Sequence, residues 1–180
     1  MAHRSVQAGD TLIEVLLAVV ILGAVIVASI AIMNRGLTAA QTSVEHSQVR
    51  LEINSQFEML RQARDAYIKD SASANGQTWA ALVTAIPPTA TLAYGAGCTT
   101  NQPGEDFYLM QTATQIERRT YNDTPAALAA TPGQGLWIEA KKSDTAVKPF
   151  VDFVVRACWV GPGSGDQRTV TAMRLYDPSR

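Results

Sequence analysis

Apolar residues form one long unbroken run near the start of the chain, whereas later they alternate with polar residues. From Val15 to Met33 there are 19 consecutive uncharged residues, mostly Val, Ile, Leu and Ala. A helix rises about 1.5 Å per residue, so this run would be roughly 28 Å long, close to the thickness of a bilayer's hydrocarbon core. The pattern predicts a hydrophobic transmembrane helix over residues 10–34.

The helix is expected to continue well beyond the apolar run. No glycine or proline occurs between Leu37 and Asp70, and Ala, Gln, Glu, Arg and Leu dominate this stretch. We therefore predict an amphipathic continuation over residues 35–70, ending at about Lys69. The small and polar residues 71–76 should stop it.

At 100° per residue, the apolar positions of this continuation form two stripes on opposite sides of the helix. One stripe, spaced by seven, contains Leu37, Val44 and Leu51; the other contains Val49, Ile53, Phe57, Leu60, Tyr67 and Ile68. A helix packed only on its own domain needs one stripe. We expect the longer stripe to seat a globular head and the shorter one to contact other helices. Alternatively, the shorter stripe is three isolated exposed apolar residues.

The remaining residues, 71–180, predict a globular head with antiparallel strands toward its C-terminus. Thr78 is placed to cap a short helix over residues 79–85, which Pro87 and Pro88 would end. A loop is expected over residues 87–105. Strand-like segments are 106–112, 136–140, 150–160 and 168–176, whereas 116–119 and 125–128 stay ambiguous.

The segment 150–160 has one wholly apolar face. That face carries Val151, Phe153, Val155, Ala157 and Trp159, which alternate with Asp152 and Arg156. We expect it to pack on Phe57 and Leu60 of the helix. The glycine-rich segment 161–167 lies between two strands and predicts a hairpin turn rather than a phosphate-binding loop. The fold class is α+β, with a long N-terminal helix and an antiparallel sheet on its second half.

Composition narrows the possible functions. The 180 residues, 19.3 kDa in all, allow one domain plus a membrane segment. The net charge is −1 with both signs scattered, so no nucleic-acid partner is evident from composition. His3 and His46 fall into no catalytic spacing, so the sequence predicts neither an enzyme nor a cofactor.

The two cysteines, Cys98 and Cys158, lie outside any C-x-x-C spacing, so a metal site is not expected. A disulfide between them is predicted, in an oxidising compartment outside the cytoplasm. Cys158 is on the strand face that points away from the helix, so the bridge would tie the irregular segment across the outer side of the sheet. Two buried free thiols are the alternative.

One acidic residue, Glu14, lies inside the apolar run that starts at Leu12. A carboxylate there costs several kcal/mol unless a cation meets it, which makes it a candidate functional residue. Otherwise it marks the membrane interface, with its carboxylate reaching headgroup water. A short polar leader, residues 1–9, ends in Gly9, and Glu14 is the fifth residue after that glycine.

This arrangement, G-D-T-L-I-E-V at residues 9–15, resembles the class III signal of type IV pilins and type II secretion pseudopilins. The resemblance implies that prepilin peptidase cuts between Gly9 and Asp10, that the new amine at Asp10 is N-methylated, and that Glu14 pairs with the N-terminal amine of a neighbouring subunit. The family usually has Phe or Met at the first mature position. Here the Asp10 carboxylate would lie beside the amine and compete with Glu14 for it.

The function implied is a structural subunit, a major or minor pilin or a pseudopilin, of an extracytoplasmic filament. Its partners would be other subunits, prepilin peptidase and an inner-membrane assembly platform with its ATPase. Its head would lie outside the cytoplasm, with the protein in the membrane before assembly. The alternative is a single-pass anchored or secreted binding domain, such as an adhesin, that does not polymerise. An ordinary secretory signal would instead place the mature start near Ile32.

Overall fold

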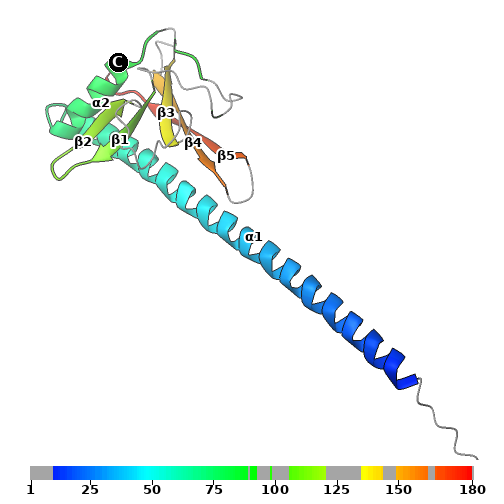
Figure 1. The fold of residues 1–180 in the computed structure, drawn as a ribbon. Helices are drawn as coiled ribbons and strands as arrows, with labels where there is room; N and C mark the ends of the chain where they lie inside the picture. The colour runs from blue at the N-terminus through cyan, green and yellow to red at the C-terminus, as the bar shows by residue number, and fades with distance from the viewer. Residues whose placement is uncertain are drawn as a thin grey trace, which may run out of the picture. The chain divides into compact units, whose positions relative to one another are not determined.

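The structure, a computed structural model, describes residues 10–88, 90–92, 98, 106–120, 135–143, 149–161 and 165–179 (Figure 1). By its internal contacts the chain divides into two units, residues 1–44 and 45–180.

A single helix, α1, runs from Asp10 to Lys69 and ends at the predicted residue. Within residues 1–44, the hydroxyls of Ser29, Thr38 and Thr42 donate to the backbone carbonyl four residues earlier, at 2.8 to 3.0 Å. These bonds satisfy polar side chains inside the helix itself, without water or a partner. These three hydroxyl side chains are therefore compatible with an apolar environment around this part of α1.

The second helix, α2 (Ala74–Ala85), begins earlier than predicted. Its N-cap is Ser73, whose Oγ accepts a hydrogen bond from the Gly76 N–H at 3.2 Å. The prediction that Thr78 caps the helix is therefore wrong, because Ser73 already supplies the acceptor. Gly76 is needed in this first turn, since a Cβ there would lie 2.6 Å from the Asp70 carbonyl oxygen.

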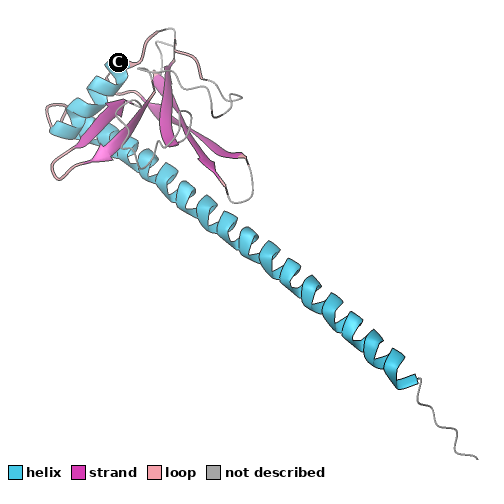
Figure 2. Ribbon diagram, in the orientation of Figure 1, coloured by secondary structure: helices cyan, strands magenta, loops and turns pink. Residues whose placement is uncertain are grey.

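Five strands form one antiparallel sheet in the order β2-β1-β3-β4-β5 (Figure 2). Their bounds are β1 Phe107–Gln111, β2 Ile116–Thr120, β3 Gly135–Lys142, β4 Phe150–Val160 and β5 Asp166–Tyr176. All four predicted strand segments are confirmed, and the ambiguous segment 116–119 is a strand. Segment 125–128 lies outside the described residues. β4 and β5 pair without a break from Phe150↔Tyr176 to Val160↔Asp166, so the glycine-rich segment does join a hairpin.

The main core lies between one face of this sheet and residues 45–69 of α1. Val151, Phe153, Val155 and Ala157 of β4 are buried in one cluster with the helix stripe that contains Ile53, Phe57 and Leu60. The predicted packing is confirmed for these residues. It is wrong for Ile68, which is 60% exposed. The buried arc of the helix is displaced to its other flank, where Gln56 and Ala63 are buried instead.

Candidate assembly helix and the contacts of the head

The first half of α1 exposes a continuous apolar surface. Its large apolar side chains from Leu12 to Met33 are all between 51% and 71% exposed. A water-soluble surface does not carry an apolar area of this size without a cover. Of the described residues, one helix, α1, is long and apolar enough to cross a membrane, and α1 is therefore suited to be a membrane anchor.

Glu14 lies in the second turn of α1, with its side chain exposed among those apolar neighbours. No ion-pair partner for Glu14 occurs among the described residues. A cation for it would thus have to come from outside this part of the chain. Asp10 is the first residue of α1, and Gly9 lies outside the described residues.

The shorter stripe of α1 is exposed along its whole length. Leu37, Val44 and Leu51 are 54%, 56% and 70% exposed. These side chains are accessible to another helix. Their contact with neighbouring helices stays a prediction.

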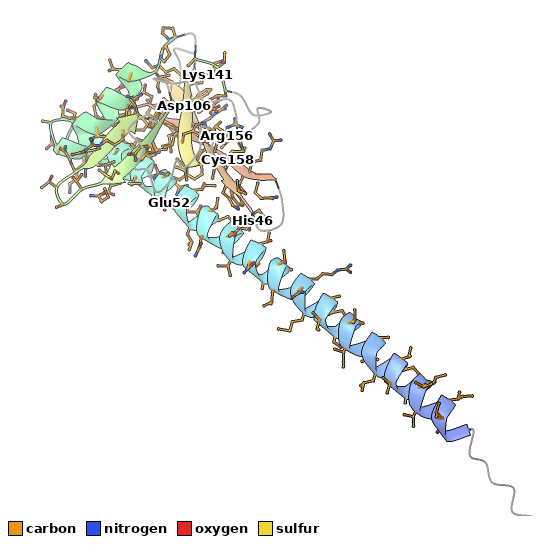
Figure 3. All side chains as sticks on the ribbon, viewed as in Figure 1. His46, Glu52, Asp106, Lys141, Arg156 and Cys158 are labelled. Carbon is orange, nitrogen blue, oxygen red and sulfur yellow. A yellow bond between two sulfur atoms is a disulfide. The ribbon has the colours of Figure 1, made fainter. Side chains whose placement is uncertain are left out.

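The end of β4 is held against α1 by a polar contact that the sequence reasoning missed. The indole N–H of Trp159 donates to Oε2 of Glu45 at 3.1 Å. The His46 ring packs edge-on against the same indole, with ring centroids 5.0 Å apart. The alternation in 150–160 places Trp159 on the apolar face, but an indole N–H that leaves water also needs an acceptor. Figure 3 shows His46 on this part of α1.

The outer face of the sheet is buried around β3 and β4, and it contains an ion pair. The guanidinium of Arg156, which is fully buried, contacts Oε1 of Glu139 through Nε and Nη2, both at 3.1 Å. The Trp137 indole N–H donates to the same oxygen at 3.3 Å. The alternation in β4 had indicated a polar face at Arg156, but alternation alone does not show whether a polar face is covered.

The predicted disulfide is present. Cys98 and Cys158 are bridged, with their Cα atoms 5.7 Å apart and a separation of 60 positions in sequence. Both are buried with Trp137 in a small cluster separate from the main core. Cys158 alternates along β4 with Val155 and Ala157 of the main core, so the bridge lies on the outer side of the sheet, as expected. Figure 3 labels Cys158 on β4.

A second arginine is partly buried on the helix-facing side of the sheet. The Arg118 guanidinium lies over the Phe107 ring, 5.0 Å from its centroid. Its Nε is buried and has no hydrogen-bond partner among the described residues. Burial lowers the pKa of Arg118, since the charged form loses hydration.

The described residues contain no group of three or more His, Cys, Asp or Glu side chains that could hold a metal ion. Searches against models of known protein families, curated proteins and solved structures found no match.

Proposed function

We propose that this chain is a structural subunit of a type IV pilus or of a related filament such as the type II secretion pseudopilus. The observation that carries the proposal is the position of Glu14, five residues after Gly9, at the start of a long apolar helix. Before assembly, α1 would anchor the subunit in the membrane with the head outside the cytoplasm. Prepilin peptidase would remove residues 1–9.

Physical chemistry supports assembly through α1. A lone carboxylate in the apolar segment costs several kcal/mol in lipid, and a neighbour's N-terminal amine would remove that cost by forming a charge-assisted hydrogen bond. Apolar burial between subunit helices would replace the lipid around residues 12–33. Leu37, Val44 and Leu51 would extend this contact toward the head. The assembly platform and its ATPase would supply the work of extraction from the membrane.

Substitution of Glu14 tests the mechanism. Glu14→Gln keeps the size of the side chain but removes its charge, and Glu14→Ala removes both. Both variants should be processed normally, accumulate in the membrane and be strongly depleted from sheared filaments. Glu45→Gln, which changes a carboxylate of the head, is the matched control and should assemble. Wild-type amounts of both Glu14 variants in filaments would overturn the proposed role of this carboxylate.

The mass of the mature N-terminus separates the filament subunit from the alternative classes. A chain beginning at Asp10 supports the proposal, and an additional 14 Da on its amine would show N-methylation. A start at Met1 would indicate a simple membrane anchor, and a start near Ile32 an ordinary secretory signal. Gly9→Ala should leave most of the protein unprocessed, because the peptidase of the resembled family tolerates little beyond glycine there.

A further inference from the structure

Three charged side chains occur in residues 10–44, and they stand at the two ends of the apolar run. Asp10 and Glu14 precede the run, and Arg35 follows it. The helix α1 is continuous over this segment (Figure 1). Arg35 comes 21 positions after Glu14, so the two residues are about 32 Å apart along the helix axis. An ion pair between them cannot form within one chain.

Arg35 is exposed on an open hollow of α1 that is also lined by Asn34, Thr38 and Thr42. The hydroxyls of Thr38 and Thr42 donate to carbonyls of their own helix, at 3.0 and 2.9 Å. The guanidinium is therefore the charged donor of this surface, and its planar fork of N–H groups matches a carboxylate. Among the described residues, neither Arg35 nor Glu14 has an ion-pair partner.

A bilayer would satisfy the two charges separately. Its hydrocarbon core is about 30 Å thick, so Glu14 and Arg35 would each reach a different headgroup layer. When helices of other subunits replace the lipid around the apolar run, both side chains lose the water of those layers. A charge in an apolar helix bundle is costly unless an opposite charge lies beside it.

We propose that Arg35 of one subunit pairs with Glu14 of a second copy of this chain, whose parallel α1 is shifted outward by 21 positions, about 32 Å. The partner of Arg35 is thus the start of another subunit's helix. This inference rests on the proposed filament, because lipid keeps the two ends apart until the subunits assemble. It adds a contact with a more distant neighbour to the amine pair at Glu14.

Charge complementarity selects this shift. Two parallel helices without a shift would place Glu14 beside Glu14 and Arg35 beside Arg35, and both contacts are repulsive. The shift instead brings opposite charges together. At 100° per residue the two side chains lie about 60° apart around the helix, so both can point into the interior of one bundle.

The resulting cluster is also balanced in charge. After cleavage the chain begins with an amine at Asp10, so residues 10–44 carry two positive and two negative charges. A carboxylate has about four lone-pair sites, enough for Glu14 to accept from one neighbour's amine and from another neighbour's Arg35. The Asp10 carboxylate that arrives with the amine is the fourth charge. Without Arg35, each subunit would bring one uncompensated negative charge into the bundle.

Cross-linking of the full-length protein in filaments tests the contact. Ala18 lies one turn after Glu14 and Ala39 one turn after Arg35, so these positions meet in the same shifted pair. In sheared filaments treated with copper phenanthroline and air, the double variant Ala18→Cys/Ala39→Cys should give a reducible ladder of multimers. The contact is heterologous and therefore propagates along a fibre, whereas a two-fold contact stops at a dimer.

Two controls belong to this experiment. Each single variant, Ala18→Cys or Ala39→Cys, can give at most a dimer, because its native cysteines are already bridged. The pair Ala28→Cys/Ala39→Cys keeps two thiols but misses the proposed shift by ten positions, about 15 Å. It should give no ladder. A ladder of equal strength from this pair would contradict the proposed shift.

Substitution of Arg35 tests the charge itself. Arg35→Glu should lower the ratio of filament to membrane protein about tenfold, with an unchanged amount in the membrane. Arg35→Lys keeps the positive charge and should assemble nearly as well as the wild type. Arg50→Glu reverses an exposed charge beyond this segment and is the matched control, which should assemble normally.

Failure of this inference is distinguishable from failure of the filament proposal. If the wild type is in filaments but the Ala18→Cys/Ala39→Cys variant gives no ladder, the Arg35 contact is wrong and the filament stands. Wild-type incorporation of Arg35→Glu has the same meaning. A loss of Arg35→Glu from the membrane with an unchanged filament ratio would show that Arg35 only anchors the helix at headgroups, which also refutes the contact. If the wild type is absent from filaments, both proposals fall.

Discussion

The side-chain amide of Gln56 on α1 bonds both backbone groups of Leu109 on β1. Oε1 accepts from the Leu109 N–H at 2.8 Å, and Nε2 donates to the Leu109 carbonyl at 3.1 Å. In the described residues β1 and β3 pair at one position, Phe107↔Ile138. Two residues further along β1, the Gln56 amide bonds the Leu109 N–H and carbonyl as the backbone of a neighbouring strand would. The helix thereby completes the sheet as well as covering it.

Gln56→Leu should destabilise the head by about 2 to 4 kcal/mol, because it leaves a buried donor and a buried acceptor without partners. The side chain keeps a similar volume, so the loss measures the hydrogen bonds rather than a cavity. Denaturant unfolding followed by tryptophan fluorescence checks the value. Gln62→Leu, at an exposed position on the same helix, should change stability by less than about 0.5 kcal/mol. Equal effects from the two variants would contradict the role of Gln56.

The buried pair of Arg156 and Glu139 predicts strongly non-additive substitutions. Arg156→Met should cost about 3 to 5 kcal/mol, since the buried Glu139 carboxylate loses its cationic partner. Adding Glu139→Leu should recover most of that loss, because no uncompensated charge then remains. A double-mutant cycle by denaturant unfolding measures the coupling. Additive effects would show that the two side chains act independently.

Removal of the disulfide should weaken the head without changing its fold. The chain-entropy estimate for a loop of 60 residues is about 4 kcal/mol, and strain commonly reduces it. Replacement of both Cys98 and Cys158 by Ala should lower the free energy of unfolding by 2 to 4 kcal/mol. The wild type measured in reductant is the matched control, and its free energy of unfolding should fall by a similar amount. An unchanged midpoint in both would contradict the prediction.

The contact of Trp159 with Glu45 should hold the tip of the β4–β5 hairpin on α1. Trp159→Phe removes the indole N–H and keeps an aromatic ring, so it should cost about 1 kcal/mol. Amide hydrogen exchange should become faster in residues 45–49 and 157–161. Glu45→Gln keeps an acceptor oxygen and should cost less. Exchange that accelerates across the whole sheet instead would indicate global rather than local loosening.

Strong periodic signals predicted the fold well. The absence of glycine and proline from Leu37 to Asp70 indicated the long helix, and the alternation at Val151, Phe153 and Val155 indicated which strand face is buried. Both depend on local chemistry that repeats along the chain. Ile68 was misassigned because it lies at the flank of the apolar arc, where burial depends on the shape of the sheet rather than on the helix.

Contacts between distant residues could not be predicted in this way. Gln56 bonds a strand 53 residues later, and Glu45 bonds an indole 114 residues later. From the sequence alone, a polar residue on α1 such as Gln56 or Glu45 would be predicted to lie in solvent. The burial of Arg156 and its contact with Glu139, 17 residues earlier, likewise could not be derived from the alternation in β4. Glu14 differs, because its significance comes from a local pattern, the distance from Gly9.

The disulfide also determines how far the protein can stretch under load. β1, β2 and β3 lie wholly between Cys98 and Cys158 in sequence. When tension is applied between α1 and the C-terminus, it bypasses this covalent loop. The intact bridge thus withholds about 200 Å of contour length, at roughly 3.3 to 3.6 Å per residue. A fibre of such subunits would resist elongation even after its heads had begun to unfold. Reduction of the Cys98–Cys158 disulfide would make the fibre much more extensible.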